Sequence, residues 1–183
     1  MSKDIVQFAR ALDFAARKHA HQRRKGELEE PYINHLADVT QMLAVATEGR
    51  DTVLVVAGLL HDTIEDTETT FAELEEEFGR EVADLVAEVS DDKALVKAER
   101  KRLQIEKAPT KSDRAKMLKL ADKTSNLHSM IHSPPVNWSL ERKRENFEWA
   151  SDVVAGCRGV NEYLEKEFDE IWQRGMELLN EER

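Results

Sequence analysis

Apolar residues recur at helical spacing along nearly the whole chain, and this pattern limits the possible folds more than any other feature. Near the start they fall at Ile5, Phe8, Leu12 and Ala15, which places them on one face of a helix. Glycine and proline, with 7 and 4 residues, are scarce and fall between the periodic segments. No segment shows the alternation of a half-buried strand bounded by turn residues. The sequence therefore predicts an all-α fold of about 8–10 helices.

Capping residues and helix breakers suggest where these helices begin and end. We expect Asp51, Thr69 or Thr70, and Ser112 to cap helices, because their short side chains accept hydrogen bonds from free backbone amides. The stretch 90–109 carries a dense mixture of charges, and its pattern fits either a helix or a mobile ordered loop. The expected helices cover residues 5–25, 34–48, 51–62, 70–78, 82–89, 112–132, 140–164 and a shorter segment that ends at 179.

Charge and cysteine content exclude several classes of protein. The chain has 37 acidic and 27 basic residues, a net charge of −10, which disfavours general nucleic-acid binding. The single cysteine, Cys157, cannot form an intrachain disulfide, and this fits a reducing compartment. No apolar run is long enough to cross a membrane, and the polar residues 1–4 do not resemble a signal peptide. We expect one cytoplasmic domain over residues 1–183.

A cluster of ionisable residues follows the most apolar segment of the chain. The run Val53–Leu60 leads directly into His61 and Asp62, and Glu65 and Asp66 follow four residues after each. On a helix, residues four apart share a face. Charged groups beside a buried segment are costly without partners. A bound metal ion is the simplest explanation for the cluster.

Two further residues could complete such a metal site. His35 lies at an expected helix start, and Asp122 lies within an apolar helical face, which is an unusual place for a carboxylate. Imidazole nitrogens and carboxylate oxygens are the usual ligands of a hydrolytic divalent metal. An alternative interpretation is that His61 and Asp62 only cap a helix end. A zinc site at His128 and His132 is a weaker alternative, because no glutamate lies between them as in zinc proteases.

Five segments and their order along the chain resemble the hydrolase domain of the RelA/SpoT family, within the HD superfamily of metal-dependent phosphohydrolases. Further matches at 91–93, 99–104 and 147–150 resemble its stand-alone small alarmone hydrolases, the metazoan SpoT homologue type. The five segments are Arg23–Gly26, Pro31–His35, Leu59–Thr67, Phe78–Val86 and Lys119–Leu127.

The resemblance implies an HD-domain helical fold around a single metal site. Its core would span about residues 4–131, and C-terminal helices at about 136–180 would pack on that core. The family binds one Mn²⁺ ion per chain, although the ligand types alone leave Mn²⁺, Fe²⁺ and Co²⁺ open. Because the resemblance covers most of the chain, we expect no synthetase or regulatory domain within the 183 residues.

The resemblance also implies a role for each candidate residue. The metal ligands would be His35, His61, Asp62 and Asp122, and Glu65 and Asp66 would position and deprotonate the attacking water. The substrate contacts would be Arg24, Lys25 and Asn126, with further cations at Lys93, Lys97, Lys101, Arg102, Lys116 and Arg142. For the cations of the mixed-charge stretch, a solvated surface is an equally good interpretation.

The implied activity is that of a guanosine-3′,5′-bis(diphosphate) 3′-pyrophosphohydrolase, which converts ppGpp or pppGpp into GDP or GTP and pyrophosphate. One alternative is a phosphohydrolase that removes a 2′- or 3′-phosphate from another nucleotide, and a second is a module that binds the alarmone without hydrolysing it. Glu65 and Asp66 favour hydrolysis, because additional carboxylates repel phosphate and hinder mere binding. Asn146, where an aromatic residue is common, and Thr124–Ser125 depart from the family pattern and bear on how the nucleotide fits. Oligomeric state is left open, with a homo-oligomer as one option.

Overall fold

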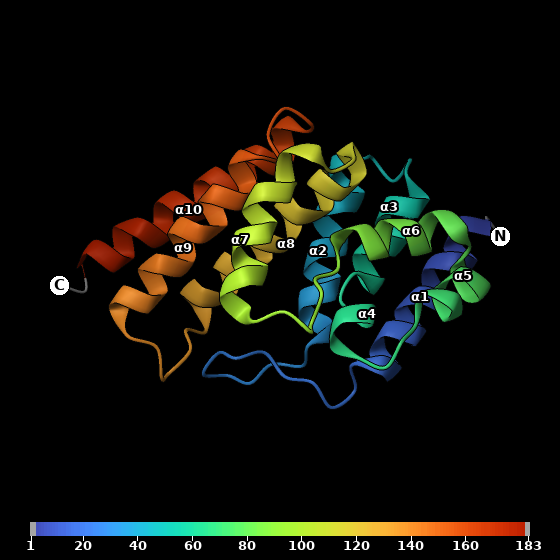
Figure 1. Ribbon diagram of the computed structural model, residues 1–183, viewed down its shortest axis with the longest axis horizontal. Coiled ribbons are helices and arrows are strands. Elements are labelled where there is room, and N and C mark those ends of the chain that lie inside the picture. The colour runs from blue at the N-terminus through green and yellow to red at the C-terminus, as the bar shows by residue number, and fades with distance from the viewer. Residues whose placement is uncertain (1–2, 182–183) are drawn as a thin grey trace.

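The computed structural model describes residues 3–181, and Met1 and Ser2 of the polar N-terminus lie outside this range. Between these residues the structure contains no strand, and the all-α prediction is confirmed. The helices, shown in Figure 1, are α1 (Lys3–Lys18), α2 (Ile33–Ala46), α3 (Thr52–Leu60), α4 (Thr63–Asp66), α5 (Phe71–Phe78), α6 (Arg80–Val89), α7 (Lys97–Lys107), the 3₁₀ turn η1 (Ala108–Thr110), α8 (Asp113–His132), α9 (Leu140–Ala155) and α10 (Glu162–Glu181). None of the described helices is long and apolar enough to cross a membrane.

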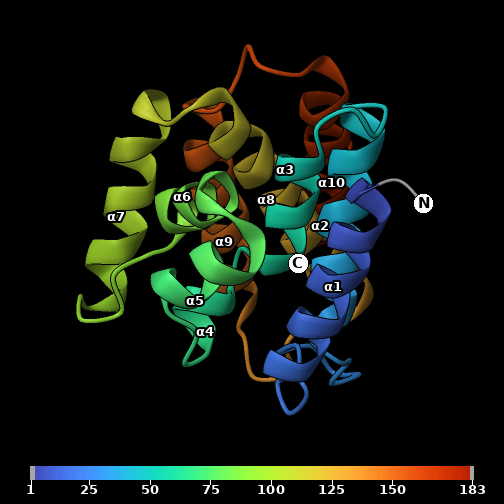
Figure 2. The ribbon, with the colours of Figure 1, turned by 90° about the vertical axis from the view of Figure 1, so that its right-hand side faces the viewer.

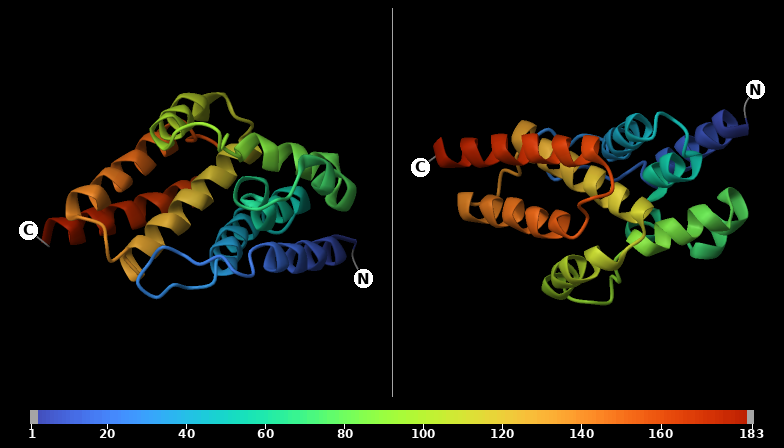
Figure 3. Two further views of the ribbon diagram at one scale, coloured as in Figure 1. Left: turned by 60° about the horizontal axis from the view of Figure 1, so that its bottom comes forward. Right: turned by 90° about the horizontal axis from the view of Figure 1, so that it is seen from above.

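Helix α8 lies at the centre of the molecule. It contacts α2, α3, α6, α9 and α10, and every residue from Leu118 to Ser125 is buried. Figure 2 shows α7 on one side of this centre and α1 and α2 on the other, and Figure 3 shows α9 and α10 side by side near the C-terminus. The apolar faces of the surrounding helices meet α8 and one another in one hydrophobic core.

The expected capping residues are confirmed. The side chain of Asp51 accepts a hydrogen bond from the Leu54 amide at the start of α3, and Ser112 accepts one from Ala115 at the start of α8. Thr70, rather than Thr69, caps α5. The charged stretch that fitted either a helix or a loop contains α7.

The expectation that the first helix continues to Lys25 is wrong. Helix α1 ends at Lys18, and the chain forms a loop from residue 19 to 32. The loop is held by its own backbone hydrogen bonds, from the Arg24 amide to the Glu30 carbonyl and from the Tyr32 amide to the Gln22 carbonyl. These cross-loop bonds replace the bonds that a longer helix would form, and they direct the loop toward α8.

The expected single helix over residues 140–164 is also wrong, because α9 ends at Ala155 and α10 begins at Glu162. Gly159 lies between them with a φ of 89°, a conformation that glycine adopts without strain. Gly156 packs closely against η1, where an added Cβ would lie 2.8 Å from the Ala108 Cβ. The break folds α10 back beside α9 and against α8.

Candidate functional site

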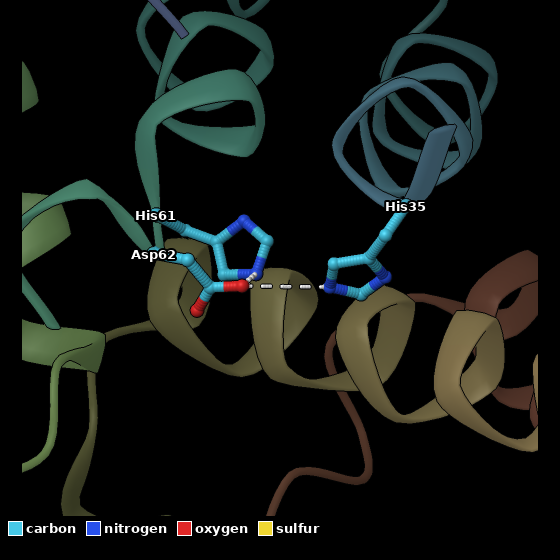
Figure 4. A group of neighbouring side chains, drawn as sticks. All are labelled: His35, His61 and Asp62. Carbon is cyan, nitrogen blue, oxygen red and sulfur yellow. Dashed lines mark ion pairs between the residues drawn. The ribbon is translucent and has the colours of Figure 1, made fainter. Parts of the chain in front are cut away.

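Three helices bring the four predicted metal ligands together. His35 lies in the first turn of α2, His61 directly follows the last residue of α3, Asp62 comes next, and Asp122 lies in the middle of α8. Figure 4 shows His35, His61 and Asp62 with their side chains pointing toward one another. The shortest contact joins the His61 Nε2 to an Asp62 oxygen at 3.1 Å, and the His35 Nε2 lies 3.4 Å from an Asp122 oxygen. The third helix was expected to include Asp62, but α3 ends at Leu60 and a turn at His61 and Asp62 precedes α4.

The two histidine rings direct their Nε2 atoms toward the two carboxylates. The His61 Nδ1 bonds the Gly58 carbonyl at 2.9 Å, and the His35 Nδ1 bonds the Ser125 hydroxyl at 2.9 Å. These contacts hold the rings, as outer-shell partners hold metal-binding histidines. The Nε2 atom of each ring is buried and has no hydrogen-bond partner. Adjacent ligands of a metal ion are about 3 Å apart when the metal–ligand bonds are about 2.1 Å, so this donor set fits a divalent cation.

The two carboxylates of this set are held in the ionised form. Asp62 accepts a hydrogen bond of 2.6 Å from the Tyr32 hydroxyl, and Asp122 pairs with the Lys123 ammonium at 3.0 Å. Burial opposes ionisation of both, but His61 lowers the pKa of Asp62 and Lys123 lowers the pKa of Asp122, in each case well below the usual range. Ligand atoms of Asp62, His35 and His61 lie within 4.8 Å of one another, and an Asp122 oxygen lies 3.4 Å and 3.9 Å from the His35 and His61 nitrogens.

We expect metal affinity to rise with pH because of His61. Burial alone lowers the pKa of His61, but Asp62 and Asp122 together raise it to about 9. A metal ligand requires the unprotonated nitrogen. Below a pH of about 9 metal binding should therefore release a proton, and the apparent affinity should fall by up to about tenfold per pH unit as the pH decreases. Calorimetry in buffers of different ionisation enthalpy measures this release. Metal binding without proton release near neutral pH would contradict the assignment.

Glu65 and Asp66, the predicted catalytic pair, lie in the short helix α4 beside the ligands. Glu65 accepts a hydrogen bond of 3.1 Å from the Asp91 amide, and burial raises the pKa of Glu65 above its usual value. Asp66 contacts Gln22 and the Lys93 ammonium through its two oxygens, at 2.9 and 2.5 Å. Both carboxylates thus lie close to Asp62, and all three line the same cleft.

A cleft of about 440 Å³ opens above this cluster. Its lining includes Asp62 and Asp122 as well as Glu65 and Asp66. Unlike most of this acidic protein, the cleft is rich in cations. Within the described residues, seven of them form no ion pair with a carboxylate; they are Arg23, Arg24, Lys25, Lys97, Arg100, Lys101 and Lys119. Unpaired cations concentrated beside a metal site favour a substrate with several phosphate groups.

The structure brings most of the predicted substrate contacts to the cleft. Arg24, Lys25, Lys97 and Asn126 line it, and the Arg24 guanidinium donates to the Asn126 side-chain oxygen at 3.2 Å. Arg142 does not line it directly but lies 4.2 Å from the centre of the Trp138 ring, which does.

Three further predicted contacts are outside the set of cleft residues. Lys93 pairs with Asp66. Arg102 lies on the exposed face of α7, where Glu99 and Glu106 pair with it, and Lys116 is outside the set of cleft residues. Arg102 is therefore better interpreted as part of a solvated, ion-paired surface than as a substrate contact.

Several cleft residues were missed in the sequence. Lys119 and Lys123 are buried in α8, with only 6% and 4% of their surface exposed. The sequence carried a signal for both lysines, because charged residues among Leu118, Leu120 and Ala121 are as unusual as Asp122 itself. Gln22 and Tyr32 were also missed, since their contacts depend on the fold of the loop between α1 and α2.

The chain matches the HD domain family over residues 11–146. It is 49% identical over 172 residues to the guanosine-3′,5′-bis(diphosphate) 3′-pyrophosphohydrolase MESH1 of Xenopus tropicalis, which covers 94% of this chain and 96% of the relative. The human protein of the same name is 48% identical over 179 residues, or 97% of this chain and 100% of the relative.

A similar structure has also been solved. It is described as a metazoan orthologue of SpoT that hydrolyses ppGpp and plays a role in starvation responses. The two structures superpose with a TM-score of 0.88 at 46% sequence identity, covering 92% of this chain and 94% of the other. The chain therefore belongs to the HD domain family and, within it, to the group that contains the MESH1 proteins.

Proposed function

We propose that this protein is a metal-dependent guanosine-3′,5′-bis(diphosphate) 3′-pyrophosphohydrolase. The observation that carries the proposal is that the Nε2 atoms of two buried histidines converge on Asp62 and Asp122, and that both carboxylates line a cleft rich in cations. Relatives and a solved structure that share nearly the whole chain carry this activity in their names. We further propose Mn²⁺ as the ion and the cytoplasm as the compartment. The buried, unpaired Cys157 supports a reducing compartment.

His35, His61, Asp62 and Asp122 would hold the ion. A divalent cation in this ligand set supplies Lewis acidity, which lowers the pKa of water and offsets phosphate charge. Glu65 and Asp66 hold the attacking water and accept its proton. The raised pKa of Glu65 makes that carboxylate a stronger base than an exposed one.

The cations of the cleft bind the two pyrophosphate groups of the substrate. Arg24 offers a planar guanidinium that matches two phosphate oxygens, and Lys25, Lys97 and Lys119 offer point charges. Water adds to the phosphorus bonded to the ribose 3′ oxygen, and the bond between that phosphorus and the 3′ oxygen breaks. The 3′ oxygen takes up a proton, and the products are pyrophosphate and GDP or GTP.

Product analysis tests this proposal. Manganese-reconstituted protein is incubated separately with ppGpp, GTP and a nucleoside 3′-phosphate, and the products are separated by ion-exchange chromatography. We expect GDP and pyrophosphate from ppGpp, no products from GTP, and loss of turnover after chelation of the metal. Turnover of the 3′-phosphate without turnover of ppGpp would disprove the proposed substrate and leave the metal site intact.

A further inference from the structure

The catalytic carboxylate of Asp66 is held from the loop between α1 and α2. The Gln22 side-chain nitrogen donates to the Asp66 Oδ2 at 2.9 Å, while Lys93 contacts the other oxygen, Oδ1. Gln22 lies 44 positions earlier in the chain, so this contact depends on the tertiary fold. It fixes the plane of the carboxylate that faces the cleft.

The orientation of the Gln22 amide is set by His19. The His19 Nδ1 lies 2.5 Å from the Gln22 Oε1. If the amide were reversed, its oxygen would face the Asp66 oxygen and two acceptors would meet without a proton. Only one orientation satisfies both contacts, and in it the proton lies on His19 Nδ1. The Nε2 of His19, which is buried and has no hydrogen-bond partner, needs no proton in this arrangement.

His19 is itself fixed by its surroundings. It is 2% exposed, its amide bonds the Ala15 carbonyl at the end of α1, and its ring stacks on Tyr32 at a centroid distance of 5.2 Å. The Tyr32 hydroxyl donates to Asp62, one of the candidate metal ligands. One buried ring therefore supports a contact to the metal ligands on one side and a contact to the catalytic carboxylate on the other.

We propose that Gln22 is a positioning residue for Asp66 and that His19 orients Gln22 through a proton on Nδ1. The catalytic part of this inference rests on the proposed function, whereas the position of the proton does not. Neither residue belongs to the candidate metal ligands. Their effect is to hold Asp66 where it can accept a proton, so their loss should lower kcat and leave KM and metal content nearly unchanged.

Substitutions at Gln22 test the first step. We expect Gln22→Ala to lower kcat about tenfold, the effect of removing a hydrogen bond to a charged group, with KM within about twofold. Gln22→Glu should lower it further, because it keeps the size and the His19 contact but places a second carboxylate against Asp66. Gln173→Ala is the matched control, since Gln173 bonds Glu177 in the same way on α10. An unchanged kcat in Gln22→Ala, or a loss due to KM alone, would overturn the proposal.

Substitutions at His19 test the second step. The amide nitrogen of His19→Asn can replace Nδ1 as a donor to Gln22, so this variant should retain most of the activity, while His19→Ala should lose as much as Gln22→Ala. Equal loss in both variants, with both folded by circular dichroism, would overturn the role of the proton.

Nitrogen NMR of the histidine rings provides a readout that does not depend on the substrate. We expect a proton on the His19 Nδ1, and a proton found only on Nε2 would overturn the orientation argued above. If the unmodified protein turns over no ppGpp, the proposed function fails, and the NMR measurement still decides the orientation of Gln22.

Discussion

Asp66→Asn should lower kcat by about 10²–10⁴-fold, the usual contribution of a general base, while the protein keeps its bound metal. Asparagine preserves the size of the side chain and can still accept a hydrogen bond from Gln22. It cannot accept a proton from water at neutral pH. Because the Asp66 carboxylate bonds Gln22 and Lys93 rather than a metal ligand, the metal ligands should remain in place.

The comparison with His61→Ala separates the two roles in the site. That variant should lose both metal and turnover, since one of the two unpartnered nitrogens is removed. Metal content by mass spectrometry and single-turnover rates with ppGpp give the two quantities for each variant. Loss of metal from Asp66→Asn would show that Asp66 is a ligand, and full activity in the same variant would exclude it as the base.

Gly175→Ala should destabilise the protein, although alanine favours helices more than glycine does. An added Cβ at this position in α10 would lie 2.1 Å from the Phe147 Cε1, and Phe147 is 2% exposed in the core. Alanine's greater helix propensity contributes about 1 kcal/mol. A methyl group that forces a packed core apart costs about 1–3 kcal/mol. Because the new Cβ would lie only 2.1 Å from the Phe147 ring, we expect a cost at or above the upper value of this range. We expect a net loss of free energy of unfolding.

Thermal unfolding of the single and double variants measures this effect. Each kcal/mol lost should lower the unfolding temperature by about 2–4 °C in a chain of this size. Phe147→Leu vacates the space that the new methyl group needs, so the double variant should lose less than the sum of the two single variants. Additive losses would show that the methyl group does not act through Phe147.

The central helices could be predicted from the sequence because their signals are local. The caps at Asp51, Thr70 and Ser112 lie next to the apolar residues whose helices they begin. The candidate metal ligands could be named for a similar reason. A histidine or aspartate beside or within an apolar helical segment is conspicuous without any knowledge of the tertiary fold.

The errors arose where contacts between distant segments decide the outcome. Helical spacing continues past Lys18, but the loop from 19 to 32 gains bonds between its own ends and to Asp66. The break after Ala155 depends on the close approach of Gly156 to η1. Similarly, Arg102 and Lys97 look alike in sequence, and only the packing of α7 directs Lys97 toward the cleft and Arg102 toward two glutamates.

Helix α8 carries Asp122 and Asn126 for the site, and Leu120 and Leu127 for the core. Each residue advances an α-helix by about 100°. Gain or loss of one residue before Asp122 would thus turn its carboxylate about 100° away from His35 and His61 and put Ala121 or Lys123 in its place. Changes of length within α8 are therefore incompatible with both folding and chemistry. Related chains can vary in length in their surface loops, whereas the interval between the start of α8 and Asn126 has to stay constant.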